Sequence, residues 1–207
     1  MADVTFKGTP FKEAIDFFQA KVRVPTRTYT DMMNKAHSKG FMVAGAMKDE
    51  LLADFQEVIG RCLRDGLTLE DFRKDFDRIV AAHGWSYNGT RGWRTRVIFE
   101  TNIRTSYAAG RWQQAQRTKR MRPYGRYVHT PNRHPREEHV AWDGKIVPLD
   151  DPWWDFRWPP NGWGCKCAVE TVSEQERQRE GWQIWNPPPD NTRSVAVKTP
   201  DGMIQDR

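Results

Sequence analysis

Five side chains in the second half of the chain are of the types that bind transition metals: His129, His134, His139, Cys165 and Cys167. Zn²⁺ prefers four nitrogen and sulfur ligands in a tetrahedron, and two histidines with a Cys-x-Cys pair could supply them. Pro135 disfavours a regular helix through His134 and His139. The Cys-x-Cys spacing is also tighter than the usual Cys-x₂-Cys knuckle. The alternative is two partly buried thiols in a glycine-rich turn, with the histidines hydrogen-bonded to backbone or solvent.

A dense run of positive charge lies between residues 91 and 126, where Glu100 is the one acid. The candidate nucleic-acid-binding residues in it are Arg104, Arg111, Arg117, Lys119, Arg120 and Arg122. Such a cluster would neutralise phosphates and give salt-sensitive, sequence-independent affinity for DNA. The alternative is that these side chains solvate a helix face, or pair with the acid-rich segment 65–77.

Residues 136–139 have the sequence Arg-Glu-Glu-His, and Asp143-Gly144 follows them. A histidine near several carboxylates could act as a general base. The sequence offers no accompanying nucleophile, phosphate-binding loop or His-Glu-x-x-His pattern. Asp143-Gly144 is also an ordinary hairpin turn ahead of a strand at Ile146. We therefore expect a structural hairpin with Arg136, Asp143 and Gly144 in structural roles, and no enzymatic activity.

The segment PPNGWGCKC, residues 159–167, predicts a rigid and tightly folded loop. The prolines stiffen its approach, the glycines and the asparagine permit turns with positive φ, and the tryptophan can pack over the turn. These structural residues are Pro160, Asn161, Gly162, Trp163 and Gly164. Such a loop would direct Cys165 and Cys167 back towards the core.

Helices are expected to precede these segments. Thr-Pro followed by apolar residues at helical spacing predicts a helix over 9–22, which Pro25 ends. A second helical stretch begins at Thr28 or Thr30 and continues to 65–66, and it could break near Gly40 and Gly45. Its later part carries an apolar stripe from Leu51 to Leu63, typical of a buried helix face.

Thr68 is expected to cap a third helix that ends at 83–84, with Phe72 and Phe76 on its buried face. A turn-rich linker over 84–92 leads to a long basic helix over 93–120. The sequence thus predicts a helical N-terminal region that continues into one long helix.

Short β-like runs appear after Pro123, at 125–130, 145–149 and 168–172, between clusters of Pro, Gly, Asp and Trp. The expected fold is α+β: an N-terminal helical region, a long basic helix and a small Trp-rich, β-containing C-terminal module. We expect a helical region over 1–84, a module over 85–180, and a Pro-rich extended arm over 181–207.

Composition bounds the function further. The chain has 207 residues, 10 tryptophans and a formal net charge of +6, which permits contacts with nucleic acid without requiring them. It shows no signal peptide and no apolar run near the ~20 residues that a membrane span needs. Three cysteines, one of them isolated at Cys62, argue against a disulfide framework, and a Cys165–Cys167 disulfide would be strained. We expect assembly in a cytosol and no membrane partner.

Three segments in order carry a resemblance to a known family: RGWRTRVIFETNIRTSYAAGRW (91–112), RPYGRYVHTPNRHPREEHVAWDGKIVPLDDPWW (122–154) and PPNGWGCKC (159–167). Together they resemble the phage Mu F-like minor head proteins, also described as phage head morphogenesis proteins. The segments FMVAGAMKDELLADFQ and TLEDFRKDFDRIVAAHGWSYNG resemble the helical region that precedes this module in Mu-like phages. The resemblance covers about residues 9 to 180.

The resemblance implies a low-copy structural protein of a tailed phage head. It would be assembled in the host bacterial cytoplasm and lie in the head interior of the virion. Its expected partners are the portal protein, capsid and scaffold proteins, and DNA bound without sequence specificity. The alternative is a metal-dependent nuclease or toxin-like effector packaged with the phage genome.

The resemblance also bears on individual residues. The family's Arg-x-x-His-x-x-x-x-Gly pattern falls on Arg136, His139 and Gly144, and its terminal Cys-x-Cys on Cys165 and Cys167. His129 matches a histidine often seen at the end of the preceding strand, whereas His134 departs from the pattern. The candidate ligands for a zinc ion are therefore His129, His139, Cys165 and Cys167.

Overall fold

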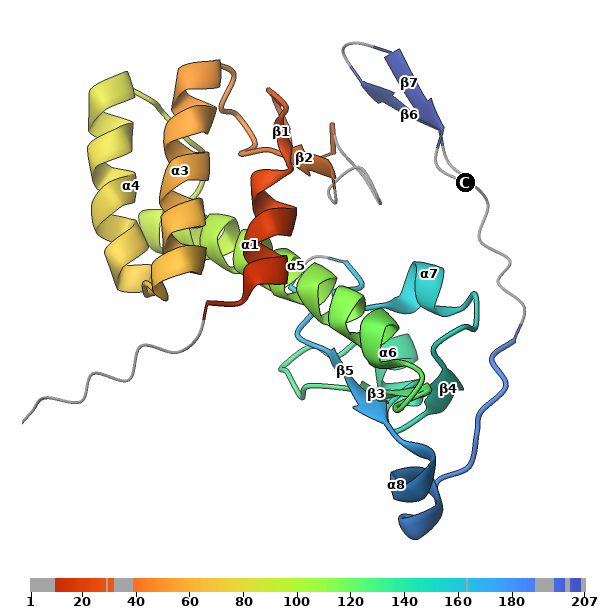
Figure 1. Cartoon of the computed structure of the whole chain (residues 1–207). Coiled ribbons are helices and arrows are strands. Elements are labelled where there is room, and N and C mark those ends of the chain that lie inside the picture. Colours follow the sequence, from red (N-terminus) through yellow and green to blue (C-terminus); the bar gives the residue numbers. More distant parts are fainter. Residues whose placement is uncertain are drawn as a thin grey trace, which may run out of the picture. The chain divides into compact units, whose positions relative to one another are not determined.

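A computed structural model describes residues 10–28, 30–31, 39–162, 164–188, 196–199 and 202–205 (Figure 1). The chain forms two compact units: unit 1 comprises Met1–Tyr107 and Ser194–Arg207, and unit 2 comprises Ala108–Arg193. Helices dominate unit 1, and a small sheet lies in unit 2, so the predicted α+β class is confirmed. The division falls within a long helix, whereas the sequence suggested a boundary between residues 84 and 85.

Unit 1 is built mainly of helices. Its elements are α1 (Lys12–Gln19), β1 (Val22–Arg23), β2 (Gly40–Phe41), α3 (Asp49–Asp65), α4 (Leu69–His83), the first part of α5 (Arg91–Thr118), β6 (Ala196–Thr199) and β7 (Gly202–Gln205). The apolar stripe of α3 lies in the core, as predicted from its spacing. Phe55 and Phe76 pack there with ring centroids 5.6 Å apart, which joins α3 to α4.

The predicted end of the first helix was wrong. α1 ends at Gln19, and Val22, expected on its apolar face, lies in β1 with 69% of its surface exposed. β1 pairs in parallel with β2, which requires extended backbone at both segments. The predicted break near Gly40 and Gly45 is confirmed, because β2 and a turn lie there and α3 follows from Asp49. The expected helical start at Thr30 precedes residues 32–38, which lie outside the described part.

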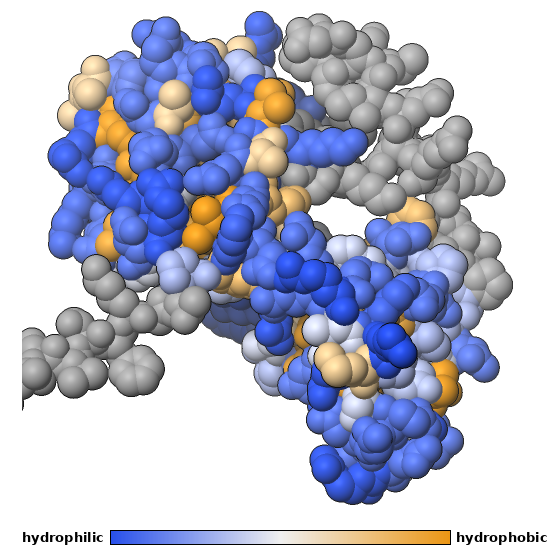
Figure 2. Space-filling model, viewed as in Figure 1, coloured by the Kyte–Doolittle hydropathy of each residue, from blue (hydrophilic) through white to orange (hydrophobic). Residues whose placement is uncertain are grey.

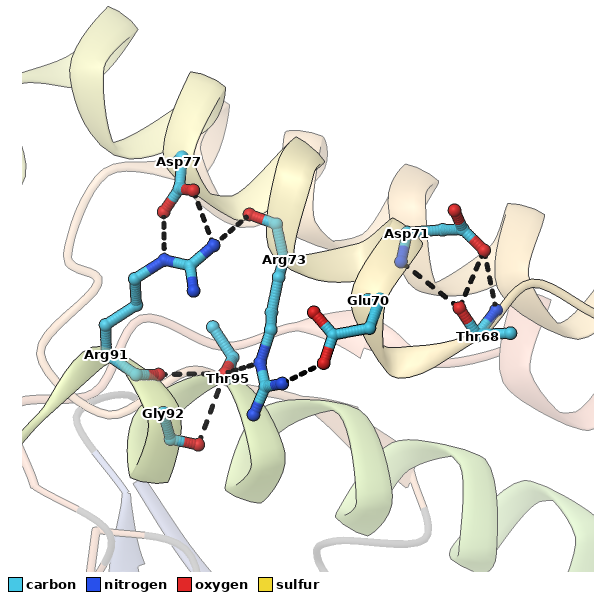
Figure 3. A network of polar contacts seen from close by, with 8 residues as sticks. All are labelled: Thr68, Glu70, Asp71, Arg73, Asp77, Arg91, Gly92 and Thr95. Carbon is cyan, nitrogen blue, oxygen red and sulfur yellow. Dashed lines mark hydrogen bonds and ion pairs between the residues drawn. The ribbon is translucent and has the colours of Figure 1, made fainter.

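The start of α4 follows the sequence prediction (Figure 3). The backbone N–H of Asp71 donates to Thr68 Oγ1 at 3.3 Å, and Asp71 Oδ2 accepts from the Thr68 backbone N–H at 3.1 Å. This capping box satisfies two N–H groups that a helix start leaves unpaired. Along the same helix Asp77 binds the Arg91 guanidinium through both oxygens at 2.6 Å (Figure 3). For Arg91, the expected pairing with the acid-rich segment is thus observed.

Lys21 is a buried cation in unit 1, with its Nζ 5.3 Å from the centre of the Phe17 ring. Burial lowers the pKa of its ammonium group from 10.5 to about 8. The folded state therefore holds fewer protons than the unfolded state between these values, so the free energy of unfolding rises as the pH increases through that window. Below about pH 8 the full cost of burying the charge is present.

We expect Lys21→Met to stabilise unit 1 at pH 7 by about 1–3 kcal/mol, because it removes this cost. The advantage should shrink as the pH rises from about 8 through 10.5, and above this range Lys21 is neutral in both states. Urea unfolding of both proteins, followed by helical circular dichroism at several pH values, measures the difference. A Met variant that is less stable at pH 7, or a difference independent of pH, would contradict this expectation.

Unit 2 is built around a small antiparallel sheet. Its elements are the end of α5, β3 (Tyr124–Val128), α6 (Glu137–Ala141), β4 (Ile146–Pro148), α7 (Trp154–Arg157), β5 (Ala168–Val172) and α8 (Glu174–Arg179). β3 is the central strand between β4 and β5, and the three predicted strands are confirmed (Figure 1). Its core packs Tyr127 and Val147 with Trp153, Trp154 and other aromatic residues.

Gly125 in β3 illustrates how closely this core is packed. A Cβ at this position would lie 2.6 Å from Cζ2 of Trp154 and 3.0 Å from Cγ1 of Val169. The segment after α8 also contributes, because Ile184 forms an isolated parallel bridge with Ile146 and the Trp185 N–H donates to the Ile146 carbonyl at 2.8 Å. The start of the predicted 181–207 arm thus lies along the sheet, and further on β6 and β7 pair as an antiparallel hairpin.

The face seen in Figure 2 is mainly hydrophilic, with hydrophobic residues scattered over it. The exposed large hydrophobic side chains include Trp93 and Tyr107 in unit 1 and Met121 and Phe156 in unit 2. Among the described helices, none combines the length and the apolar character that crossing a bilayer would take.

Candidate metal centre

Four candidate ligands predicted from the sequence lie close together in unit 2. The Nδ1 atom of His139 is 3.8 Å from Cys165 Sγ and 3.6 Å from Cys167 Sγ. Cys167 Sγ is also 3.5 Å from Nδ1 of His129. The donor atoms of His139, Cys165 and Cys167 all lie within 4.8 Å of one another. His139 and the two cysteines therefore converge on one point, and His129 approaches this group at Cys167.

His129 is held at the end of β3 by its own backbone. Its N–H donates to Asp143 Oδ1 at 2.8 Å, and the Gly144 N–H donates to the Tyr127 carbonyl at 2.9 Å. Gly144 adopts a φ of 72°, a conformation that favours glycine, so the turn after α6 can approach the strand. The Asp-Gly pair predicted as a hairpin turn thus fixes the segment that carries the histidine.

His139 lies on α6 and is 4% exposed. The Trp142 ring stacks on its imidazole at a centroid distance of 5.4 Å and an interplanar angle of 25°, which fixes the ring plane. Burial, and then the nearby Arg136 guanidinium, lower the pKa of His139. A neutral imidazole is the form that binds metal ions.

The cysteines lie on the loop between α7 and β5. Gly162 and Gly164 have φ values of 88° and 71°, as predicted for a loop with positive-φ turns, and the peptide bond between Pro159 and Pro160 is cis. The Cys165 N–H donates to the Gly162 carbonyl at 3.2 Å, which turns the chain inward. Cys165 is 4% exposed, and burial raises the pKa of its thiol. Trp163 lies outside the described residues.

Tyr127 is a site residue that the sequence analysis missed. Its hydroxyl accepts from Asn161 Nδ2 at 3.2 Å, and a hydrogen bond with Cys167 helps to raise the tyrosine pKa after burial. The same Asn161 amide donates to the Arg157 carbonyl at 2.9 Å. Tyr127 precedes His129 by two positions in a strand, and this spacing places both side chains on one face. That periodicity was the available signal.

The other candidate metal-binding and acid–base residues do not lie at this site. His134 is exposed and only its backbone N–H binds, to Asn132 Oδ1 at 2.9 Å. Glu137 and Glu138 are exposed, while His139 faces the sulfur atoms. Arg136 is the residue before α6, and its Nη2 would lie 3.5 Å from a Cβ at Gly162, so the guanidinium lies beside the cysteine loop.

The six candidate nucleic-acid-binding residues differ in their ion pairs and in their exposure to solvent. Arg104 pairs with Glu100, Lys119 with Asp150, and Arg122 with Glu176. Arg111, Arg117 and Arg120 are exposed. Arg111, Arg117 and Arg122 also line a hollow of about 410 Å³ between the end of α5 and β5, beside Trp158 and Thr171. The exposed part of the basic surface is thus narrower than the sequence suggested.

Comparison with known proteins finds one family and two curated relatives. The family described as Phage Mu protein F like protein matches residues 53–170, a range that contains all four candidate ligands. A protein of Escherichia phage Mu named "Putative capsid assembly protein F" is 30% identical over 207 residues, covering 92% of this chain and 47% of that protein. The "Mu-like prophage FluMu F protein" of Haemophilus influenzae is 32% identical over 169 residues, covering 77% of this chain and 41% of that protein.

The chain thus spans less than half the length of each of these relatives. No solved structure matches it. The family match covers most of unit 2 and the part of unit 1 from residue 53 onward, and the phage Mu relative covers 92% of the chain.

Proposed function

Because the chain belongs to the Phage Mu protein F like family, we propose that it is a minor protein of a Mu-like phage head that acts in capsid assembly. The observation that carries the proposal is the family match over residues 53–170, supported by the relative in phage Mu that is named as a putative capsid assembly protein. In this role it is present in few copies, is made in the host bacterial cytoplasm and lies in the interior of the head.

The experiment that tests this role is quantitative mass spectrometry of purified heads from the phage or prophage that encodes the chain. We expect the protein in intact heads, at a few copies relative to the major capsid protein. Inactivating the gene should reduce the yield of heads, and expression of the wild-type chain in trans should restore it. Heads that form in normal yield without the protein would contradict a role in assembly.

Contact with the portal protein is part of the proposal. Unit 1 exposes Trp93 (54%) and Tyr107 (44%) on α5, and large aromatic residues are enriched in protein interfaces. Both lie on a long helix whose backbone hydrogen bonds are internal, so the two side chains are presented on a rigid support. Capsid and scaffold proteins are further proposed protein partners, which could contact the same exposed aromatic residues.

DNA contact without sequence specificity is a second part of the proposal. Arg111, Arg117 and Arg120 are exposed near the end of α5, and Arg111 and Arg120 hold no ion pair with any described residue. Phosphate groups are the partners that exposed arginines of this kind bind through charge-assisted hydrogen bonds. A duplex packaged in the head would supply them.

We expect wild-type chain to bind duplex DNA with an affinity that falls steeply with salt. Reversing the charge at Arg111, Arg117 and Arg120 to Glu should weaken binding and reduce the slope of log affinity against log salt by up to about 3, since each lost phosphate contact removes roughly 0.9. Fluorescence anisotropy over a salt series measures both quantities.

The matched control reverses the same number of exposed cations in unit 1, at Arg27, Lys39 and Lys48. This control changes the net charge by the same amount. It therefore distinguishes DNA binding at one local surface from a general dependence of binding on net charge. Equal loss of affinity in the two variants would contradict a DNA-binding surface at the end of α5.

An enzymatic role as a metal-dependent nuclease or packaged effector is less well supported. Catalytic zinc sites keep one coordination position open for water or substrate, whereas the two cysteines and two histidines would fill four positions. Two of the four, Cys165 and His139, are buried away from any substrate. The cluster is therefore better suited to a structural role.

A further inference from the structure

We propose that unit 2 binds one Zn²⁺ ion through Cys165, Cys167, His129 and His139, and that this ion joins three segments of the fold. The set contains two sulfur and two nitrogen donors, which is a ligand set typical of structural zinc sites. Soft thiolates together with imidazoles select zinc over the hard cations Mg²⁺ and Ca²⁺, which take oxygen ligands.

Three sulfur–nitrogen distances match those of a tetrahedral site, and His129 contacts the group formed by His139, Cys165 and Cys167 through Cys167. With Zn–S near 2.3 Å and Zn–N near 2.0–2.1 Å, a tetrahedral angle places sulfur and nitrogen about 3.6 Å apart. The three sulfur–nitrogen distances are 3.5, 3.6 and 3.8 Å. All ligand nitrogens that face the sulfurs are Nδ1, so both histidines would bind through that atom.

Hydrogen bonds alone do not account for this arrangement. Nδ1 of His139 carries either one proton or one lone pair, so it can form one linear hydrogen bond, yet it faces both sulfur atoms. Cys167 can donate its thiol proton to one imidazole and accept from the other, which leaves the contact between Cys165 and His139 without a hydrogen bond. A metal ion at the centre would satisfy all three contacts at once.

The surroundings fix the ligands as metal sites require. Trp142 stacks on His139, Asp143 holds the backbone of His129, and Asn161 holds Tyr127 beside Cys167. Thr130 Oγ1 donates to the Lys166 carbonyl at 2.8 Å, which ties the end of β3 to the loop between the two cysteines. Such contacts with neighbouring residues orient the ligands, and losing one typically costs about 10–100-fold in metal affinity.

The segments that the ion would join are short or irregular. His129 lies beyond the end of β3, His139 lies on the five-residue helix α6, and the cysteines lie on a loop. A unit of this size has a small hydrophobic core, and small domains commonly gain stability from a metal. Two thiolates also neutralise the charge of Zn²⁺, so the closed site can be buried.

The test is Co²⁺ substitution in the full chain. We expect one Co²⁺ per chain, with the visible absorption of a tetrahedral site and a thiolate-to-cobalt charge-transfer band whose intensity corresponds to two sulfur ligands. Added Zn²⁺ should displace the cobalt and abolish the bands. Absence of the bands, or an octahedral spectrum without thiolate absorption, would overturn the proposal, and this wild-type result does not depend on whether any variant folds.

Variants then assign the ligands. Cys165→Ser, Cys167→Ser and His139→Ala should each abolish the tetrahedral spectrum or weaken Co²⁺ binding by at least tenfold, and His129→Ala should weaken it and change the spectrum. The matched control is His134→Ala, an exposed histidine on the same connection, which should bind one Co²⁺ with an unchanged spectrum. Unchanged binding in Cys167→Ser, or a loss in His134→Ala equal to that in His139→Ala, would overturn the assignment.

Discussion

Removal of the metal ion is expected to unfold unit 2 and to leave the helical core of unit 1 folded. Zinc binding to small domains contributes an apparent free energy of about 10–16 kcal/mol at neutral pH, comparable with or larger than the stability of about 5–15 kcal/mol of a whole domain. The proposed ligands hold the end of β3, α6 and the cysteine loop, and the remaining core of unit 2 is built from a few aromatic residues around Tyr127 and Val147.

Hydrogen exchange followed by mass spectrometry measures both units in one sample. After treatment with a strong zinc chelator, peptides covering β3, β4 and β5 should exchange rapidly, while those covering α3 and α4 should keep their protection. Re-addition of Zn²⁺ should restore protection. Unchanged protection in unit 2 after the metal content has fallen to zero would contradict a structural role for the ion.

Phe76→Ala is expected to destabilise unit 1 by about 3–5 kcal/mol, the range for removing a fully buried aromatic side chain. Phe76 has no exposed surface, and its ring contacts Phe55, Trp85 and Tyr87 at centroid distances of 5.6, 6.2 and 5.2 Å. Its removal leaves a cavity between α3, α4 and the segment that follows α4. The backbones around the cavity cannot move in to fill it without losing other contacts.

Urea unfolding followed by helical circular dichroism measures this effect, with Phe76→Leu and Val22→Ala as controls. Phe76→Leu keeps most of the volume and should cost less than about 1.5 kcal/mol, and Val22→Ala changes an exposed position and should be nearly neutral. The cobalt spectrum of Phe76→Ala should equal that of the wild type, because the ligands lie in unit 2. A loss no greater than that of Val22→Ala would contradict the assigned core of unit 1.

The elements that could be predicted from the sequence carry strong local signals. The apolar stripe from Leu51 to Leu63 fixes the buried face of α3, and Thr68 with Asp71 forms the cap that starts α4. The pair formed by β1 and β2 was missed because each strand has two residues, which is too short for an alternating pattern. Val22 therefore seemed to continue a helix.

The candidate site was predicted in its residue types but not in its geometry. The sequence indicated Cys165, Cys167 and a histidine, while the choice of His129 over His134 came from the family resemblance. Their convergence depends on the turn at Gly144 and on the Cys165 N–H bond to Gly162, which sequence spacing does not determine. Metal binding itself stays a prediction. Trp142 stacks on one ligand, a contact that sequence spacing does not determine either.

The most direct test of the proposed function is co-purification of the chain with the portal protein encoded in the same phage or prophage genome. The two proteins are expressed together, with the tag on the portal only, and washed over a series of salt concentrations. We expect this chain to remain bound at high salt, as contact through apolar residues such as Trp93 predicts, while an unrelated protein of equal net charge is lost. No association at any salt concentration would contradict a portal-associated role in head assembly.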